Sequence, residues 1–434
     1  MQHRPHASIL GGSLAVGAAT ALRLAASFAI AIVVSRALGV EAKGQLALLQ
    51  QFPAIAALLL GLGFEAAHAY HVGRHRSDSA ATVSDSLAYA LAVSAVGIPL
   101  TMLVTQLFVP ALDLVSTITL AVAAATVLPL LLTALMGGIL TGLGRVPSQA
   151  LAQAAAAASS LALIVALAVI GQLTLEKVVA ASAIALAIGA VSATLATRAR
   201  SLPRPSLARL RAELPYARRS YVQMVTGYLE MRQDVLLLGI LGSAAGVGVY
   251  SVAVSLAELL FYAPQTLGVA LTARSLQEDA EDGASLTART TRLLTAFMCM
   301  SAGVLAIVAR PLVVFLFGAQ FAQAATVIAV LIPGIMVWGI ASQPAAYLAT
   351  HGRLFPRMST ATLLINFTLN LALIPVLGPV GAAVATAVSY SVISGYIIRT
   401  FVRETGTRSR DLFVVRLADV RFAVAAVRAL RRPS

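Results

Sequence analysis

The sequence predicts an all-α protein that crosses a membrane many times, and two observations carry this prediction. The 434 residues are 59% hydrophobic and only 11% charged, with a mean hydropathy of +0.89, whereas a soluble domain is about a quarter charged. Apolar stretches of about 20 residues, the length that spans a bilayer as a helix, recur from one end of the chain to the other. Such segments span membranes as helices, because a helix satisfies its own backbone groups.

About 12 stretches of this length follow one another along the chain. They are predicted at residues 12–37, 44–70, 83–108, 116–142, 148–171, 177–198, 217–241, 245–272, 290–316, 323–349, 355–376 and 379–401. Segment 290–316 is the weakest of these predictions, because its "RPLVVFLFGAQFA" could also enter the membrane interface.

Positive charges gather in alternate connections between the predicted helices. The net charge is +14, and the longest basic connection is "RARSLPRPSLARLRAELPYARRS" at Arg198–Ser220. The opposite connections hold only Arg36, Lys43, Lys177 and Arg310. Since Lys and Arg stay on the cytoplasmic side, both termini are predicted to be cytoplasmic and the number of spans even. Charge confined to loops and the tail fits an anionic leaflet, so nucleic acid is not expected as a partner.

Two pairs of similar segments indicate an internal repeat. "GLGRVPSQA…VIG" (Gly142–Gly171) and "THGRLFPRM…VLG" (Thr350–Gly378) share a Gly-Arg turn, a span and a closing Gly. "ALGVEAKGQLAL" and "ILGSAAGVGVYSVA" share Leu-Gly, a short gap, and a Gly that opens a new span. An offset of about 200 residues with the same starting side predicts a parallel repeat, which leaves a central cavity between two lobes in transporters. Chance similarity among Gly-rich turns is the alternative.

The repeat and the long basic connection define the predicted domains. Residues 1–200 form an N-terminal six-helix lobe, 201–216 a cytoplasmic linker, and 217–401 a C-terminal six-helix lobe. Residues 402–434 form a basic cytoplasmic tail, in which Arg alternates with Leu, Val and Phe at helical spacing. The tail pattern is typical either of an amphipathic helix on the inner leaflet or of an ordinary solvated tail.

A few ionisable residues fall at membrane depth, where a charge costs roughly 2.5–3.5 kcal/mol at a helix centre and therefore needs a partner or water. They are Arg23 in the first span, Glu65 in the second, Glu230, Arg232 and Asp234 in the seventh, and Glu258 in the eighth. Glu230 and Asp234 are four residues apart on one helix face and would repel each other. Arg23, from the other lobe, is the candidate that would relieve this repulsion.

Arg23 and Arg232 are the predicted substrate-binding residues. A guanidinium is permanently charged and planar, and it matches phosphate oxygens with two parallel hydrogen bonds. A pair of them in a hydrated cavity therefore suits a pyrophosphate group. A buried charge network that only holds the lobes together is the alternative.

The carboxylates are predicted to couple or to balance charge. Glu230, Asp234 and Glu258 are candidates for counter-charges or proton carriers within the membrane. Glu65 lies about one turn from the end of its span, beside His68, and could instead extend its carboxylate to the interface.

Several enzyme signatures are missing from the sequence. It has no GxxxxGK[ST], HExxH or GxSxG motif, and its histidines lack ligand spacing. Cys299 is the single cysteine and is expected to be a packing residue. We therefore predict no metal, no cofactor and no enzymatic activity.

Three motifs, in order, resemble those of a known transporter family. They are "VVSRALGVEAKGQLALLQQFPAIAALLLGLGFEAA", "MRQDVLLLGILGSAAGVGVYSVAVSLAELL" and "AAYLATHGRLFPRM…LNLALIPVLGPVGAAVATAVSYSV". The chain resembles, over nearly its whole length, the polysaccharide transporter (oligosaccharide flippase) branch of the multidrug/oligosaccharidyl-lipid/polysaccharide (MOP) exporter superfamily.

The resemblance implies a two-lobed, MATE-like bundle that works by alternating access. It implies translocation of a polyprenyl-diphosphate-linked oligosaccharide across the bacterial inner membrane, for lipopolysaccharide or exopolysaccharide synthesis. Membrane lipids, a glycan polymerase and glycosyltransferases are the implied partners. Arg23 and Arg232 fit the cationic cavity that such flippases use for anionic lipid heads.

Three alternatives stay open. A cation-coupled exporter of drugs or small amphiphiles is disfavoured because the first span carries Arg23 and no carboxylate. A lipid II flippase is disfavoured because the two additional spans of that branch have no counterpart. A glycan polymerase or ligase needs a reaction chamber outside the membrane, for which the short outer connections leave no room.

Overall fold

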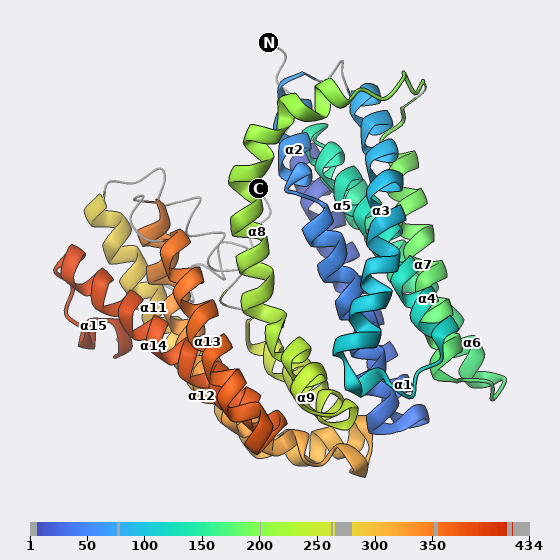
Figure 1. Cartoon of the computed structure of the whole chain (residues 1–434). Helices are drawn as coiled ribbons and strands as arrows, with labels where there is room; N and C mark the ends of the chain where they lie inside the picture. The colour runs from blue at the N-terminus through green and yellow to red at the C-terminus, as the bar shows by residue number, and fades with distance from the viewer. Residues whose placement is uncertain are drawn as a thin grey trace. The chain divides into compact units, whose positions relative to one another are not determined.

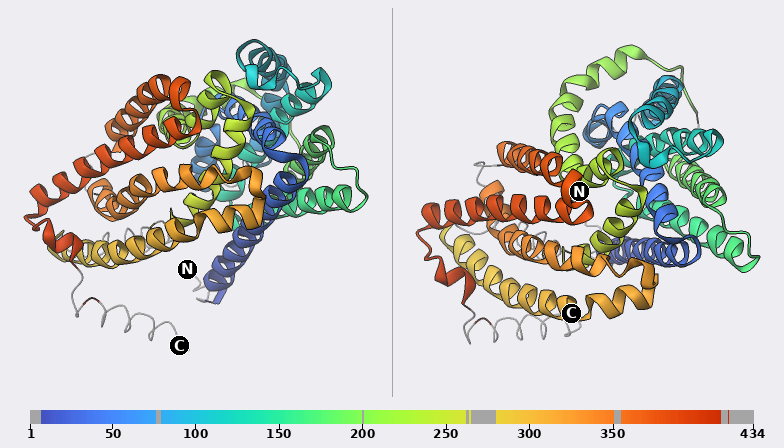
Figure 2. Two further views of the ribbon diagram at one scale, coloured as in Figure 1. Left: turned by 90° about the horizontal axis from the view of Figure 1, so that it is seen from below. Right: turned by 60° about the horizontal axis from the view of Figure 1, so that its bottom comes forward.

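The computed structural model describes residues 7–75, 79–199, 201–261, 264, 280–350, 355–414 and 419, and every regular element in these ranges is helical. Figures 1 and 2 show long helices joined by short connections. The chain divides into two compact units, which we call the N-terminal unit (Met1–Gly248) and the C-terminal unit (Val249–Ser434). The predicted all-α membrane fold is confirmed.

The helices of the N-terminal unit are α1 Ala7–Leu60, α2 Phe64–Arg74, α3 Ser79–Phe108, η2 Pro110–Leu112, α4 Thr117–Ala125, α5 Val127–Gly142, α6 Val146–Val169, α7 Leu175–Ala196 and α8 Leu207–Leu241. Helix α9, Ala244–Ala257, contains the boundary between the units. Those of the C-terminal unit are η3 Glu258–Phe261, α11 Ala280–Phe317, η4 Ala319–Phe321, α12 Ala324–Thr350, α13 Phe355–Leu377, α14 Pro379–Thr405 and α15 Arg410–Phe413.

Ten helices in the described part of the chain are long and apolar enough to cross a membrane. The first candidate, Leu14–Leu60, combines two predicted spans, because α1 bends at Gly39 instead of ending there. The predicted seventh span lies in α8, whose Glu230, Arg232 and Asp234 keep it out of this count. The ten candidates are therefore compatible with the predicted number of about 12.

The bend in α1 depends on a glycine. Gly39 has φ 87° and ψ −176°, a backbone conformation that residues with a Cβ rarely adopt. The bend divides α1 into a first limb, which carries Arg23, and a second limb, which carries Lys43. Both limbs can therefore supply side chains to the same space.

Small residues allow the helices of the N-terminal unit to approach closely. A Cβ on Gly138 of α5 would lie 2.1 Å from the carbonyl oxygen of Glu65 in α2. A Cβ on Gly44 would lie 1.7 Å from the carbonyl oxygen of Ala244, and one on Gly248 would lie 2.1 Å from that of Val40. Helices in membranes commonly associate through such small residues.

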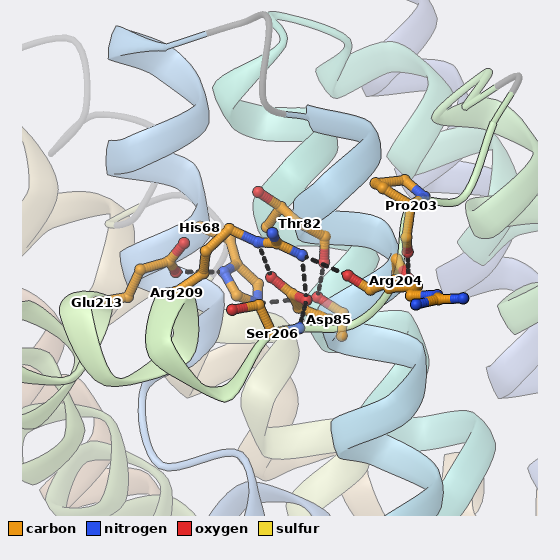
Figure 3. A network of polar contacts seen from close by, with 10 residues as sticks. His68, Thr82, Asp85, Pro203, Arg204, Ser206, Arg209 and Glu213 are labelled. Atoms are coloured by element: carbon orange, nitrogen blue, oxygen red, sulfur yellow. Dashed lines mark hydrogen bonds and ion pairs between the residues drawn. The ribbon is translucent and has the colours of Figure 1, made fainter.

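The start of α8 and the connection before it are bound to Asp85 of α3 by an ion pair and a backbone hydrogen bond (Figure 3). Arg209 donates two hydrogen bonds to Asp85, of 2.6 Å and 2.8 Å, and the backbone N–H of Ser206 donates to the same carboxylate at 2.7 Å. Beside it, His68 Nδ1 lies 2.7 Å from Glu213 Oε2, and Ser86 lies 3.0 Å from His68 Nε2. These contacts place the start of α8 against α2 and α3.

The predicted linker 201–216 is therefore irregular only before α8 begins at Leu207. Because α8 also packs against α1, α2 and α3, it belongs to the N-terminal compact unit. The predicted lobe boundaries remain a prediction.

The C-terminal unit contains an ion pair in a corresponding place. Arg292 of α11 donates hydrogen bonds of 2.7 Å and 2.8 Å to Asp419, and Arg289 lies 3.3 Å from the same carboxylate. Asp419 is almost fully buried and follows the last membrane-crossing candidate, α14. Residues 415–418 and 420–434 of the predicted amphipathic tail lie outside the described residues.

Candidate functional site

A cavity of ≈ 790 Å³ lies within the N-terminal unit. Both limbs of α1, together with α2, α4, α5, α6, α7 and α8, contribute to its wall. The sequence explains the space, since the facing residues are often small, including Ala156, Ala157 and Ser160 of α6 and Ala185 and Gly189 of α7. A wall of small side chains leaves volume that Leu or Phe would fill.

Two cations line this cavity, Arg23 and Lys43. Both residues lie in α1 and are partly buried. With a helical rise of about 1.5 Å per residue, Arg23 lies roughly 24 Å along the first limb from Gly39, and Lys43 roughly 6 Å along the second. The two cations therefore stand at different depths of one cavity.

Lys43 is the residue that the sequence analysis missed. It was assigned to an outer connection, because the second span was predicted to begin after it. The bend at Gly39 continues the helix through this position, so Lys43 faces the cavity instead of open solvent. Gly39, directly before "VEAKG", is the sequence feature that could have indicated a bend within a continuous helix.

Glu65 is the one carboxylate among the described residues that line the cavity. It lies in the first turn of α2, two residues after Gly63, whose φ of 79° reorients the chain. Glu65 is partly buried, and its backbone carbonyl packs closely against Gly138 of α5. The side chain is therefore held in the cavity wall, at the end of the second limb of α1.

The remaining polar lining is mostly neutral. It consists chiefly of Gln50, Gln149, Gln153, Ser160 and Ser182. A glutamine amide both donates and accepts hydrogen bonds, and a serine hydroxyl does the same. Such groups can bind sugar hydroxyls without fixing a charge. Neutral side chains carry little cost at membrane depth, so the sequence gives no signal that singles out this set.

Helix α8 reaches the cavity through Tyr228. The amide of Gln51 donates a 2.8 Å hydrogen bond to the Tyr228 hydroxyl and connects α8 to α1. Arg232 lies one turn further along α8, on the same helix face, but is not among the residues that line the cavity.

The three residues of α8 that were predicted to carry charge at membrane depth, Glu230, Arg232 and Asp234, all have interaction partners. Glu230 and Arg232 are partly buried, and Asp234 is 5% exposed. Pairing of Arg23 with Glu230 or Asp234 stays a prediction. Glu258 lies in η3 of the C-terminal unit, where it is partly buried and also has a partner.

The C-terminal unit contains a buried polar cluster that sequence reasoning also missed. The Asn366 amide donates to Thr386 and Ser389 at 3.3 Å each, and the Asn370 amide donates to Asn366 Oδ1 at 2.7 Å. The Tyr250 hydroxyl lies 3.3 Å from Thr386. The two asparagines, one turn apart in an apolar segment, were the available signal.

Within the described residues, no group of three or more His, Cys, Asp and Glu side chains is arranged to hold a metal ion. Cys299 is an exposed residue of α11, whereas a packing role was predicted.

The comparisons with known proteins agree with this fold. A family model described as polysaccharide biosynthesis protein matches residues 33–326. Among curated proteins, none matches the chain.

Solved structures share the architecture at low sequence identity. The lipid II flippase MurJ in an inward closed conformation is 13% identical, with a TM-score of 0.78, over 96% of this chain and 93% of that one. An inward-facing multidrug resistance MATE family transporter of the MOP superfamily is 15% identical, with a TM-score of 0.72, over 88% and 94%. These similarities establish the fold of the chain.

Proposed function

Because the chain belongs to the polysaccharide biosynthesis protein family, we propose that it is a flippase for a polyprenyl-diphosphate-linked oligosaccharide. It would carry the sugar from the cytoplasmic to the outer leaflet of the bacterial inner membrane. One observation supports this substrate most strongly: two cations, Arg23 and Lys43, line a single cavity within the membrane-spanning helices.

The diphosphate is the part of the substrate that these cations suit. A charge at membrane depth requires a partner or water, and a bound diphosphate supplies the partner. Because the two cations stand at different depths of the cavity, Arg23 would bind the diphosphate through a planar fork at one position along its path, and Lys43 as a point charge at another. Arg232 remains a proposed third cation, since it lies one turn from Tyr228.

The sugar part of the substrate would be bound by neutral side chains. The neutral Gln and Ser side chains of the cavity offer both donors and acceptors to sugar hydroxyls. Glu230, Asp234 and Glu258 are proposed to couple transport to protons or to the membrane potential. A glycan polymerase and glycosyltransferases are proposed as partners.

The experiment replaces one cation at a time in a deletion strain. We expect Arg23→Ala to abolish surface glycan export and to cause the lipid-linked intermediate to accumulate. Arg36→Ala is the matched control, because Arg36 is an exposed residue of the same limb of α1. Normal export by an Arg23→Ala protein at wild-type abundance would refute the proposed role.

A cation-coupled exporter of small amphiphiles is the second candidate, and the position of Glu65 in the cavity lining favours it. A carboxylate there could bind a cationic solute. On that alternative, Glu65→Gln would sensitise cells to cationic drugs and leave surface glycan intact. On the flippase proposal, the deletion strain loses glycan and keeps its drug resistance.

A further inference from the structure

A second, smaller cavity adjoins the first in the N-terminal unit. Its volume is ≈ 230 Å³, and it lies between the second limb of α1, the start of α2, α5 and α8. The two cavities share four lining residues, Glu65, Leu130, Ala134 and Tyr228. We call the smaller cavity the side pocket.

The side pocket is chemically unlike the main cavity. Its own lining residues are almost all apolar, among them Ala54, Leu58, Leu131 and Met224. In the part of the chain that the structure describes, only the shared Glu65 and the tyrosines Tyr221 and Tyr228 add polar side chains to its lining. Apolar pockets of this kind bind hydrocarbon.

We propose that the side pocket binds the isoprenoid segment next to the diphosphate of the transported lipid. This inference rests on the proposed function and goes beyond it by giving the lipid carrier its own binding site in the protein. In a polyprenyl diphosphate, the charged group and the hydrocarbon are covalently adjacent. The protein shows the same order of groups, because the cavity that contains Arg23 and Lys43 shares part of its wall with an apolar pocket.

The size and surroundings of the pocket limit what it can hold. A volume of ≈ 230 Å³ admits a short branched hydrocarbon segment and excludes a whole polyprenyl chain. Leu59 and Val222, which follow the lining residues Leu58 and Tyr221 in the sequence, are 42% and 62% exposed. The rest of the chain would follow these apolar residues into the lipid.

Glu65 fixes the orientation of the bound lipid. Glu65 lines both cavities, and its carboxylate would repel phosphate at their junction. The diphosphate is therefore kept on the Arg23 side, and the hydrocarbon passes Tyr228 into the side pocket.

The test compares two ligands that differ only in hydrocarbon. Inorganic pyrophosphate and geranyl diphosphate are titrated by calorimetry into the full chain in nanodiscs, with empty nanodiscs as the blank. Each buried methylene is worth about 0.8 kcal/mol, so we expect geranyl diphosphate to bind at least ~10-fold more tightly than pyrophosphate.

Two variants fill the side pocket from different helices, Ala54→Phe on α1 and Met224→Trp on α8. Both are expected to abolish the advantage of geranyl diphosphate and to keep the wild-type affinity for pyrophosphate. Retained pyrophosphate binding also reports that each variant is folded. Ala92→Phe, at an exposed position of α3, is the matched control and should keep the advantage.

The outcomes separate the two proposals. A geranyl advantage that persists in both filled variants, or that the wild-type protein lacks, overturns the side-pocket assignment and leaves the diphosphate site intact. Failure of the wild-type protein to bind either ligand overturns the diphosphate site itself, and the side-pocket assignment with it.

Discussion

At the scale of single residues, the cations of the cavity are distinguished by geometry as well as by charge. Arg23 presents a planar fork that can bind two phosphate oxygens, whereas an ammonium group at the same position is a point charge. The two lining cations therefore should not be interchangeable.

We expect Arg23→Lys to keep part of the export that Arg23→Ala loses. The substitution preserves the charge and removes the bidentate hydrogen bonds, each worth about 1.5–3 kcal/mol when the partner is charged. Initial rates of glycan appearance at matched protein levels measure the effect. Equal rates for Arg23→Lys and wild type would show that the fork has no role.

We expect the loss of Lys43 to reduce the export rate less than the loss of Arg23, and to act through the lost charge in the cavity. We expect Lys43→Ala to lower the export rate partially, because Arg23 still attracts the diphosphate. Lys177→Ala is its control, since Lys177 is exposed and hydrogen-bonds only at the surface, to Gln172. A similar loss in both variants would indicate a general charge effect and contradict a role in the cavity.

At the scale of helices, the close approach of Gly44 to Ala244 is the strongest constraint in the N-terminal unit. A Cβ there would lie 1.7 Å from a carbonyl oxygen, so the helices must separate. We expect Gly44→Ala to destabilise the protein by about 1–3 kcal/mol, the usual cost of overpacking. Thermal unfolding in detergent measures this change.

The same helix provides the control. A Cβ at Gly17 of α1 meets nothing within 4 Å, so Gly17→Ala should stabilise the helix by about 0.5–1 kcal/mol. If Gly44→Ala and Gly17→Ala shift the unfolding midpoint in the same direction, the tight crossing is not the cause.

The ion pair at the start of α8 has a counterpart in the C-terminal unit. Arg209 and Asp85 are 124 residues apart, and Arg292 and Asp419 are 127 apart. In each unit the pair joins a residue in the first half of one long helix, Asp85 of α3 or Arg292 of α11, to a residue that follows several further helices, and the charges are exchanged. An internal repeat would produce such a correspondence, and the repeat that the Gly-rich turns indicate stays a prediction.

Exchanging the two charged residues tests the contribution of the Asp85–Arg209 ion pair to stability. Asp85 is 3% exposed and Arg209 is 41% exposed, so Arg209→Asp leaves a buried carboxylate facing a second one. We expect a loss of about 2 kcal/mol, reduced by solvent near Arg209. The double variant Asp85→Arg with Arg209→Asp should recover part of it, and no recovery would show that the pair is not the source.

At the scale of the whole molecule, composition and periodicity predicted most of the fold, because bilayer length and helical hydrogen bonding leave few alternatives. The candidate site was harder to predict. Arg23 and Glu65 were found by their cost in the membrane, but Lys43 was not, since a bend that continues a helix and a turn that ends it have the same Gly-rich sequence. The neutral glutamines carry no such cost and gave no signal.

The orientation of the molecule in the membrane follows from the distribution of its arginines and is the last prediction. With cytoplasmic termini, the connection between α3 and α4 faces outward and the one before α8 faces inward. A Cys299→Ser background removes the only cysteine. Leu114→Cys, at a position that is 87% exposed, should then react with an impermeant maleimide in intact spheroplasts. Ser201→Cys, also exposed, should react only after permeabilisation. The reverse pattern would invert the whole arrangement, and with it the direction of the proposed transport.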